Sequence, residues 1–235
     1  MPITIKTTEE IALLREGGKR LASILKKLVA EVKPGVSAGT LNALAQKLML
    51  NGGDTPSFLG YVPSGAKRPY PASLCVSIND EVVHGIPNET EKLLKEGDIV
   101  TLDTGLIHKG LFTDSAVTVG VGKIDAKAKK LLEVTKKSLL VGIKAVRAGA
   151  TTGDVGFAIE SFVKPYGFGI VRELAGHGVG YAVHEEPFVP NFGKKGEGMV
   201  LKAGMVIAIE PMLNEGGAGV KLDSDGYTYR TRDGS

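Results

Sequence analysis

Asp103 and Asp114 are the residues whose surroundings most clearly indicate chemistry. Residues 99–106 are rich in β-branched and aliphatic side chains, residues 108–110 can form a turn, and a second strand pattern covers residues 111–121. These features predict a β-hairpin in which the Asp114 side chain lies opposite Asp103. Two carboxylates buried side by side repel each other and lose their hydration, which is costly unless a proton or a cation lies between them. The pair therefore predicts a metal site.

His177 and Glu210 supply the kinds of ligand that would complete such a site. His177 stands in a Gly-His-Gly-Val-Gly sequence, and flanking glycines let the backbone approach where a Cβ would clash. Three carboxylates and one imidazole form an oxygen-rich set that suits Mn²⁺, Fe²⁺ or Co²⁺ better than a structural zinc ion, and Asp114 could bridge two ions. Taken singly, each residue has an ordinary structural explanation as a hydrogen-bonded carboxylate, a turn acceptor, an ion-pair partner or a core histidine.

Other candidate residues are less specific. His84 and His184 stand beside Gly-Ile-Pro and Glu-Glu-Pro sequences, where a histidine can serve a turn. Cys75 is predicted to be a small buried hydrophobic residue, because no base adjoins it in sequence to activate a thiol nucleophile. The glycines around His177 lack the full dinucleotide-binding fingerprint, and the sequence contains neither a P-loop nor a His-Glu-x-x-His motif.

Composition and charge restrict the class of protein. The 235 residues are 43% hydrophobic and 23% charged, which is typical of a globular chain with a sizeable core. One cysteine allows no intrachain disulfide, and no secretory signal pattern or membrane-spanning apolar run is present, so we expect a cytoplasmic protein without a membrane partner. The net charge of +3 is mild, and the lysines of residues 127–147 are interpreted as a solvated helix face. DNA is therefore not an expected partner, whereas an RNA-rich surface such as the ribosome remains open.

The elements that must position these residues can be read from hydrophobic periodicity and caps. A long amphipathic helix is predicted from Thr7 or Thr8 to the stop at residues 34–35, and a shorter one over residues 37–49. A loop follows over residues 57–72 and a strand over residues 73–78. After the hairpin, Asp125 caps a helix to about Arg147, and another helix covers about 152–163.

An internal repeat organises these elements into two halves. Residues 32–40 and 146–154 share the order helix end, glycine stop, hydroxyl residue, glycine and new helix. Further matches between the two halves follow later in the chain, and the number of residues that separates matched positions varies only by about the length of a loop. The repeat predicts an α+β fold of two pseudo-symmetric halves, roughly 7–121 and 125–235, each of helices packed on an antiparallel sheet, facing each other across a central cleft.

The repeat also aligns the candidate functional residues. A shared Leu-Lys-x-Gly sequence precedes the segments that end at Asp103 and Glu210, and a shared Val-His dipeptide pairs His84 with His184. Chance could explain a recurring helix and strand order, but it explains these shared positions poorly. Each half is therefore expected to deliver one strand carboxylate and one histidine to the cleft.

Taken together, these residues resemble those of the type I methionine aminopeptidases, which belong to the two-metal pita-bread metallopeptidase family. The resemblance spans nearly the whole sequence. Only 33 positions separate His177 from Glu210, which leaves no room for the helical insertion of the type II enzymes. Its most specific parts are residues 77–87, the pair Asp103 and Asp114, residues 176–180, residues 184–187 and residues 209–212.

The resemblance implies roles for individual residues and a single catalytic domain over residues 1–235. It implies that Asp103, Asp114, His177 and Glu210 bind two divalent ions of cobalt, manganese, iron or zinc, with Asp114 bridging. His84 and His184 would contact the substrate near the scissile bond, and Glu210 would also act in catalysis. The pocket for the methionine side chain would be formed by Cys75, Tyr61, Tyr70 and Tyr227. The implied activity is removal of N-terminal methionine from peptides and nascent chains by a monomer.

One departure from the family and three alternatives accompany this interpretation. The family places a last bridging glutamate shortly after the position of Ser235, so we expect a weak second metal site. An X-Pro aminopeptidase or dipeptidase would share the fold, but the pocket around Cys75 and the short chain argue against it. A catalytically silent protein that binds peptides or partners is supported by the missing carboxylate and opposed by the retained histidines. A ribosome-associated role through the lysine-rich helix is compatible with the enzyme.

Overall fold

The computed structural model describes residues 3–235, which form two units. The N-terminal unit consists of Ala12–Asp125 with Lys221–Arg230. The C-terminal unit consists of the chain up to Ile11, Ala126–Val220 and Thr231–Ser235. The candidate residues are divided between the two units. Within residues 3–235 no helix has the length and apolar character needed to cross a membrane.

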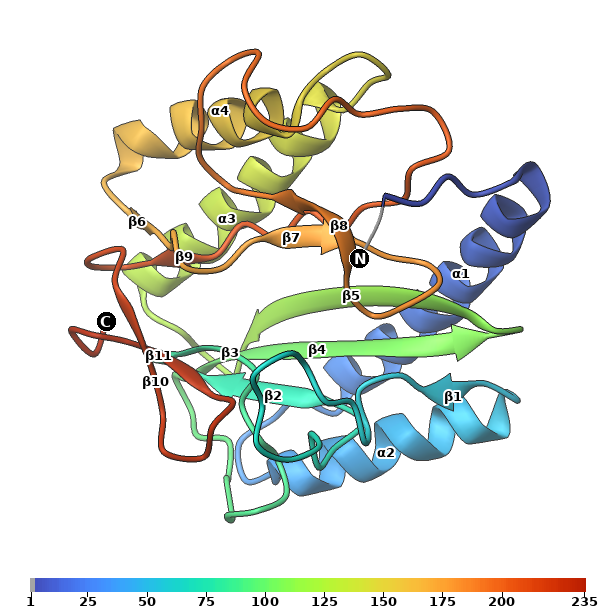
Figure 1. The fold of residues 1–235 in the computed structure, drawn as a ribbon. Helices are drawn as coiled ribbons and strands as arrows, with labels where there is room; N and C mark the ends of the chain where they lie inside the picture. Colours follow the sequence, from blue (N-terminus) through green and yellow to red (C-terminus); the bar gives the residue numbers. More distant parts are fainter. Residues whose placement is uncertain (1–2) are drawn as a thin grey trace. The chain divides into compact units, whose positions relative to one another are not determined.

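The N-terminal unit packs two helices against an antiparallel sheet (Figure 1). The helices are α1 (Thr8–Ala30), most of which lies in this unit, and α2 (Ala38–Asn51), which Ser37 caps at its N-terminus. The sheet contains β1 (Thr55–Pro56), β2 (Cys75–Ile78), β4 (Ile99–His108) and β5 (Leu111–Gly120), with β4 between β1 and β2 and also paired to β5. The predicted helices and hairpin are therefore present, and the predicted strand over residues 73–78 begins at Cys75.

Alternation along strand β4 places its large core residues on one face and Asp103 on the other. Val100, Leu102 and Leu106 are fully buried in the core formed with α1 and α2. Successive strand residues point to opposite faces, so Thr101 and Asp103 lie on the face away from the helices. Apolar residues thus hold one face of the strand on the core while its other face carries the candidate carboxylate.

The C-terminal unit places two helices beside small two-stranded sheets (Figure 1). Helix α3 (Ala126–Ala145) packs against α4 (Thr152–Val163), which Thr151 and Asp154 cap in a capping box. A short 3₁₀ helix follows over Lys164–Tyr166. Strand β6 (Gly169–Ile170) pairs with β9 (Leu213–Asn214), and β7 (Gly176–Gly178) pairs with β8 (Glu185–Val189). A separate core joins these helices and strands, with Val155, Ile159 and Val163 fully buried in it.

Three remaining short strands complete the topology. Strand β10 (Val220–Leu222) and β11 (Tyr229–Thr231) form a three-stranded sheet with β3 (Glu81–Val83), in the order β10, β11, β3. Tyr229 pairs with Val83 in this sheet.

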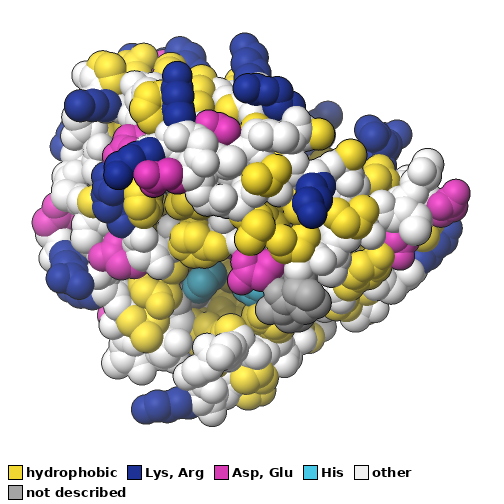
Figure 2. Space-filling model, turned by 45° about the horizontal axis from the view of Figure 1, so that its top comes forward, with side chains coloured by type: hydrophobic (Ala, Val, Ile, Leu, Met, Phe, Trp, Pro, Cys, Tyr) yellow, Lys and Arg dark blue, Asp and Glu magenta, His cyan; other side chains and the backbone are white. Residues whose placement is uncertain are grey.

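Helix α3 ends at Ala145, two residues before the predicted end, and its lysines are exposed as expected of a solvated helix face. On the face drawn in Figure 2, lysine and arginine side chains are spread out rather than gathered into one patch.

The two units repeat one another at the turn between their helices. Gly35 and Gly149 both have a φ of +87°, a conformation that favours glycine. The N–H of Gly35 donates to the carbonyl of Leu94 at 2.8 Å, and the N–H of Gly149 donates to the carbonyl of Leu201 at 2.9 Å. These are the positions that the sequence repeat aligns. The hydrogen bonds give a physical basis for the pseudo-symmetry of the two halves.

Candidate active site

The two aspartates lie on the same face of the β4–β5 hairpin, but not in the predicted arrangement. Asp103 pairs with Ala116, and Asp114 pairs with Gly105, so the two aspartates are diagonal neighbours rather than directly opposite. Diagonal positions on antiparallel strands are typically about 7–8 Å apart. Both residues are half-buried, not buried as expected. The pair is thus accessible and wide enough to accept a cation between its carboxylates.

Cys75 is brought against this face by strand pairing. It is opposite Asp103 in the β2–β4 ladder and is only 3% exposed. Burial raises the pKa of the Cys75 thiol well above its ordinary value, and the charge of Asp103 raises it further, while a hydrogen bond with Tyr70 partly opposes this. The thiol is therefore neutral at physiological pH, which agrees with the prediction of a hydrophobic wall rather than a nucleophile.

The tyrosines predicted to line the same pocket gather around Cys75. The Tyr70 hydroxyl donates to the carbonyl of Gly85 at 3.1 Å, and its ring lies edge-on to Tyr227 with centroids 5.1 Å apart. The N–H of Tyr70 donates to the carbonyl of Tyr61 at 2.8 Å. Burial, followed by the neighbouring Tyr227 hydroxyl, raises the pKa of Tyr61. Four of the predicted residues therefore form one largely apolar cluster in the N-terminal unit.

His84 occupies a strained position at the end of β3. Its φ is +59°, which is uncommon for a residue with a side chain and is often found where function fixes the backbone. The Thr228 hydroxyl donates to the His84 carbonyl at 3.4 Å, and the His84 ring lies edge-on to Tyr229 with centroids 6.1 Å apart. The next residue, Gly85, is held by the Ser77 hydroxyl, which accepts its N–H at 3.0 Å. These contacts fix the direction of the imidazole.

In the C-terminal unit, two glycines allow close backbone approach around His177, as predicted. A Cβ on Gly176 would lie 2.3 Å from the carbonyl oxygen of Ala208, and one on Gly178 would lie 2.2 Å from that of Glu186. The N–H of Ala208 donates to the His177 carbonyl at 2.7 Å. No Cβ can be accommodated at either glycine without a backbone shift, so both positions require glycine.

His177 faces Glu210 and His184 within this unit. Its Nε2 lies 3.1 Å from Oε1 of Glu210, and its ring lies edge-on to His184 with centroids 4.3 Å apart. Glu210 is not on a regular strand, contrary to the prediction from the repeat. It follows a segment that bridges to β7 at Ile207, and the Asn191 amide donates to its backbone carbonyl at 2.7 Å.

The polarity of the His177 contacts shows that this pair fits a cation. Its Nδ1 lies 2.8 Å from the carbonyl oxygen of Gly178, an acceptor, so Nδ1 carries the hydrogen. In the neutral ring Nε2 then presents a lone pair to Glu210 Oε1, which is buried and has no hydrogen-bond donor among residues 3–235. Two acceptors at 3.1 Å repel unless a proton or a cation lies between them. An imidazole nitrogen with a carboxylate oxygen suits a divalent transition ion.

Each unit holds two of the four predicted ligands, Asp103 and Asp114 in the N-terminal unit and His177 and Glu210 in the C-terminal unit. Residues 3–235 include no group of three or more histidine, cysteine, aspartate or glutamate side chains that could hold a metal ion. Sequence reasoning also assigned no role to Lys6 and Glu185, which form a buried ion pair, and Glu185 directly follows His184 in the chain. Their contact joins positions far apart in the chain, and no local pattern signals it.

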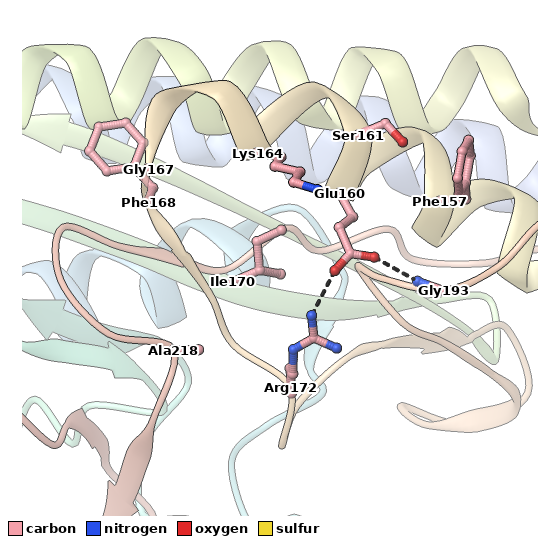
Figure 3. A pocket seen from close by; sticks show the side chains of 10 residues that line it. All are labelled: Phe157, Glu160, Ser161, Lys164, Gly167, Phe168, Ile170, Arg172, Gly193 and Ala218. Atoms are coloured by element: carbon pink, nitrogen blue, oxygen red, sulfur yellow. Dashed lines mark hydrogen bonds and ion pairs between the residues drawn. The ribbon is translucent and has the colours of Figure 1, made fainter.

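A cavity elsewhere in the C-terminal unit is not this site. It has a volume of about 520 Å³ and lies beside α4 and β6. Figure 3 shows Glu160 in its wall, accepting hydrogen bonds from Arg172 at 2.6 Å and from the N–H of Gly193 at 3.3 Å. No residue predicted to be catalytic, metal-binding or substrate-binding lines it. The lining of this cavity therefore carries none of the candidate chemistry.

Comparisons with known proteins identify relatives along the whole chain. Residues 12–228 match the model of metallopeptidase family M24. A methionine aminopeptidase of Aquifex aeolicus is 46% identical over 100% of this chain and 92% of its own length. The crystal structure of a methionine aminopeptidase from Rickettsia prowazekii has a TM-score of 0.94 and 38% identity, covering 100% of this chain and 92% of that one. A prolidase from Pyrococcus furiosus has a TM-score of 0.73 and 25% identity, covering 91% and 59%.

Proposed function

The chain belongs to metallopeptidase family M24 and has its pita-bread fold, and we propose that it is a metal-dependent hydrolase that removes the N-terminal methionine from peptides and nascent chains. The observation that carries this proposal is the similarity to methionine aminopeptidases over the full chain. The pairing of His177 with Glu210 supports it, because two acceptors this close need a proton or a cation between them. A peptidase of this family uses divalent metal.

We propose Asp103, Asp114, His177 and Glu210 as the metal ligands, with Asp114 shared between two ions of cobalt, manganese, iron or zinc. The diagonal aspartates on one hairpin face and the acceptor pair in the other unit support this set. When bound, such ions activate water as a nucleophile and polarise the scissile carbonyl. The hydrogen on Nδ1 of His177, fixed by the Gly178 carbonyl, keeps Nε2 available as the ligand atom.

The remaining polar residues are assigned to substrate binding and proton transfer. We propose that the Glu210 carboxylate accepts a proton from the attacking water and delivers it to the leaving amine. His184 donates a hydrogen bond to the carbonyl oxygen as negative charge develops on it. His84, with its backbone fixed by Thr228, orients the peptide amide and assists the departing nitrogen.

The substrate side chain is proposed to occupy the cluster of Cys75, Tyr61, Tyr70 and Tyr227. The neutral thiol and the aromatic rings give an apolar surface, and a methionine thioether makes favourable contacts with such rings. Tyr70 and Tyr227 have their hydroxyls bound to the carbonyls of Gly85 and Arg68, so both rings are held in place. A fixed pocket favours one side chain over shorter or charged ones.

The cellular setting is also a proposal. We propose that the protein acts as a monomer in the cytoplasm, where nascent chains are the substrates and a single cysteine is compatible with reducing conditions. Exposed lysines on α3 support contact with the ribosome surface. Co-sedimentation with ribosomes that falls as salt is raised is the expected result, and binding unchanged by salt contradicts a simple electrostatic contact.

A peptide panel tests the substrate class. The metal-loaded protein is given Met-Ala-Ser, Ala-Ala-Ser and Ala-Pro-Ser, and free amino acids are measured. Release of methionine alone is expected, because the proposed pocket is shaped for its side chain. Preferred cleavage of the Ala-Pro bond would instead support the specificity suggested by the similarity to a prolidase. Cleavage of no peptide would favour a silent binding protein.

A further inference from the structure

Lys6 and Glu185 form an ion pair that is almost completely enclosed in the C-terminal unit. Lys6 Nζ lies 2.6 Å from Glu185 Oε2, and the two side chains are 1% and 2% exposed. Removing two charges from water is costly unless further hydrogen bonds satisfy them. The Glu185 carboxylate also accepts hydrogen bonds from the Thr4 hydroxyl and from the N–H groups of Tyr181 and Ala182. The pair is therefore part of a complete polar network.

This network holds the loop that carries His184. The loop runs from Gly180 to Glu185, and both of its ends touch the Lys6 side chain. A Cβ on Gly180 would lie 2.3 Å from Lys6 Cε, and the Lys6 Nζ lies 5.0 Å from the ring centre of Tyr181. The loop therefore wraps around the ammonium group, with His184 next to the carboxylate that binds it.

Backbone contacts fix the segment that contains Lys6. Ile3 forms a parallel bridge with Glu186, and the N–H of Lys6 donates to the carbonyl of Gly204 at 2.8 Å. The segment before α1 is thus held at two points, and the lysine enters the loop from a rigid support. A charge held in this way can define one loop conformation among several of similar energy.

We propose that Lys6 is a positioning residue, which acts through Glu185 to hold the His184 imidazole against His177 in the orientation that the reaction requires. This inference rests on the proposed function of His184. Lys6 does not touch the substrate, because its ammonium is enclosed by the loop and Glu185. Its effect should therefore appear in kcat more than in KM.

Lys6→Met tests the proposal, because it removes the charge and keeps an unbranched side chain. A misplaced catalytic group can cost about 10²-fold in rate, so kcat for Met-Ala-Ser is expected to fall by about that factor, with KM nearly unchanged. The matched control is Lys194→Met, since Lys194 also pairs with a carboxylate, Glu197 at 3.6 Å, but is 81% exposed. This control should leave kcat unchanged.

A double-mutant cycle separates positioning from general damage. In a His184→Ala background, Lys6→Met should cause little further loss, because the group it positions is already gone. An equal loss in both backgrounds would overturn the proposal, as would full activity of folded Lys6→Met. If Lys6→Met does not fold, Thr4→Val removes only one hydroxyl of the network, and a smaller loss that disappears in the His184→Ala background is expected.

A spectroscopic measurement keeps the inference separate from the proposed activity. The ring resonances of His184, assigned by comparison with His184→Ala, are expected to shift in Lys6→Met and not in Lys194→Met. Unshifted resonances would overturn the positioning role even in an active enzyme. An inactive wild-type protein in which the resonances shift would refute the proposed function and leave the structural relation between Lys6 and His184 intact.

Discussion

His177 Nε2 and Glu210 Oε1 lie 3.1 Å apart, and in the neutral ring both atoms are acceptors, because the opposite ring nitrogen of His177 donates to Gly178. This relation predicts that Glu210→Gln raises the stability of the metal-free protein and lowers its metal affinity. The amide can donate to Nε2, so the metal-free variant should be more stable than the metal-free wild type by about 1 kcal/mol. Its metal affinity should fall at least about 100-fold, because a charged ligand is lost. Thermal unfolding and calorimetric metal titration measure the two effects, and a variant that is less stable without metal would contradict the interpretation.

The hairpin aspartates provide a second prediction. Asp114→Asn should lower kcat by at least about 10²-fold and reduce the metal bound per chain, because it removes a proposed anionic ligand of the ions that activate water. Its fold should persist, since Asp114 lies on the hairpin face away from the helices. The neighbouring exposed residue supplies the control, Ser115→Ala, which should retain activity. Full activity of Asp114→Asn would refute its role as a ligand.

The Cys75 thiol should react slowly with alkylating agents. Burial raises its pKa, so the reactive thiolate is rare in the folded protein, and access is also blocked. Alkylation by iodoacetamide at about pH 8 is expected to be at least about 100-fold slower in the folded protein than in denaturant. Mass spectrometry gives the rate without ambiguity, because the chain has one cysteine. Rapid labelling of the folded protein would contradict the burial of the thiol.

Glu185 should make stability depend on pH in the acid range. Burial raises its pKa, but hydrogen bonds from Lys6, Thr4 and two backbone N–H groups lower it more, so the pKa lies below its ordinary value of 4.5. The stabilisation is therefore complete above pH 4.5 and is lost as pH falls through the folded-state pKa, because the unfolded chain takes up the proton first.

Glu185→Gln isolates this effect. Urea unfolding of wild type and variant from about pH 7 to about pH 3 should show a difference in unfolding free energy that shrinks with acidity. An exposed carboxylate variant, Glu197→Gln, is the control and should show no such trend. A difference that is constant across the range would mean that the carboxylate charge is not what stabilises the fold.

Hydrophobic alternation predicted the hairpin but not its register. Strands β4 and β5 and the turn between them agree closely with the prediction, because the alternation and the turn residues are local signals. The register depends on the two-residue turn formed by Lys109 and Gly110, both with positive φ, and it shifts Asp114 from Asp103 to Gly105. The sequence therefore predicted correctly that Asp103 and Asp114 share a face of the hairpin, whereas the register that makes them diagonal neighbours required the structure.

Contacts between distant residues account for most of what sequence reasoning missed. Lys6 precedes the first predicted helix and looks like any charged residue at a helix start, yet it is buried against Glu185. Glu210 was expected on a strand because the repeat aligns it with Asp103, but its segment is held by a single bridge to β7 and by Asn191. Tertiary contacts decide both cases, and local propensity carries no information about them.

Methionine release from Met-Ala-Ser by metal-stripped protein, titrated with Mn²⁺ or Co²⁺ while bound metal per chain is counted, tests the central claim most directly. We expect no release without metal and release that rises with the number of ions bound, in wild type but not in Glu210→Gln. The count at full activity also shows whether one ion or two are needed. Metal bound in full with no methionine released, or equal release from the stripped protein, would contradict the account.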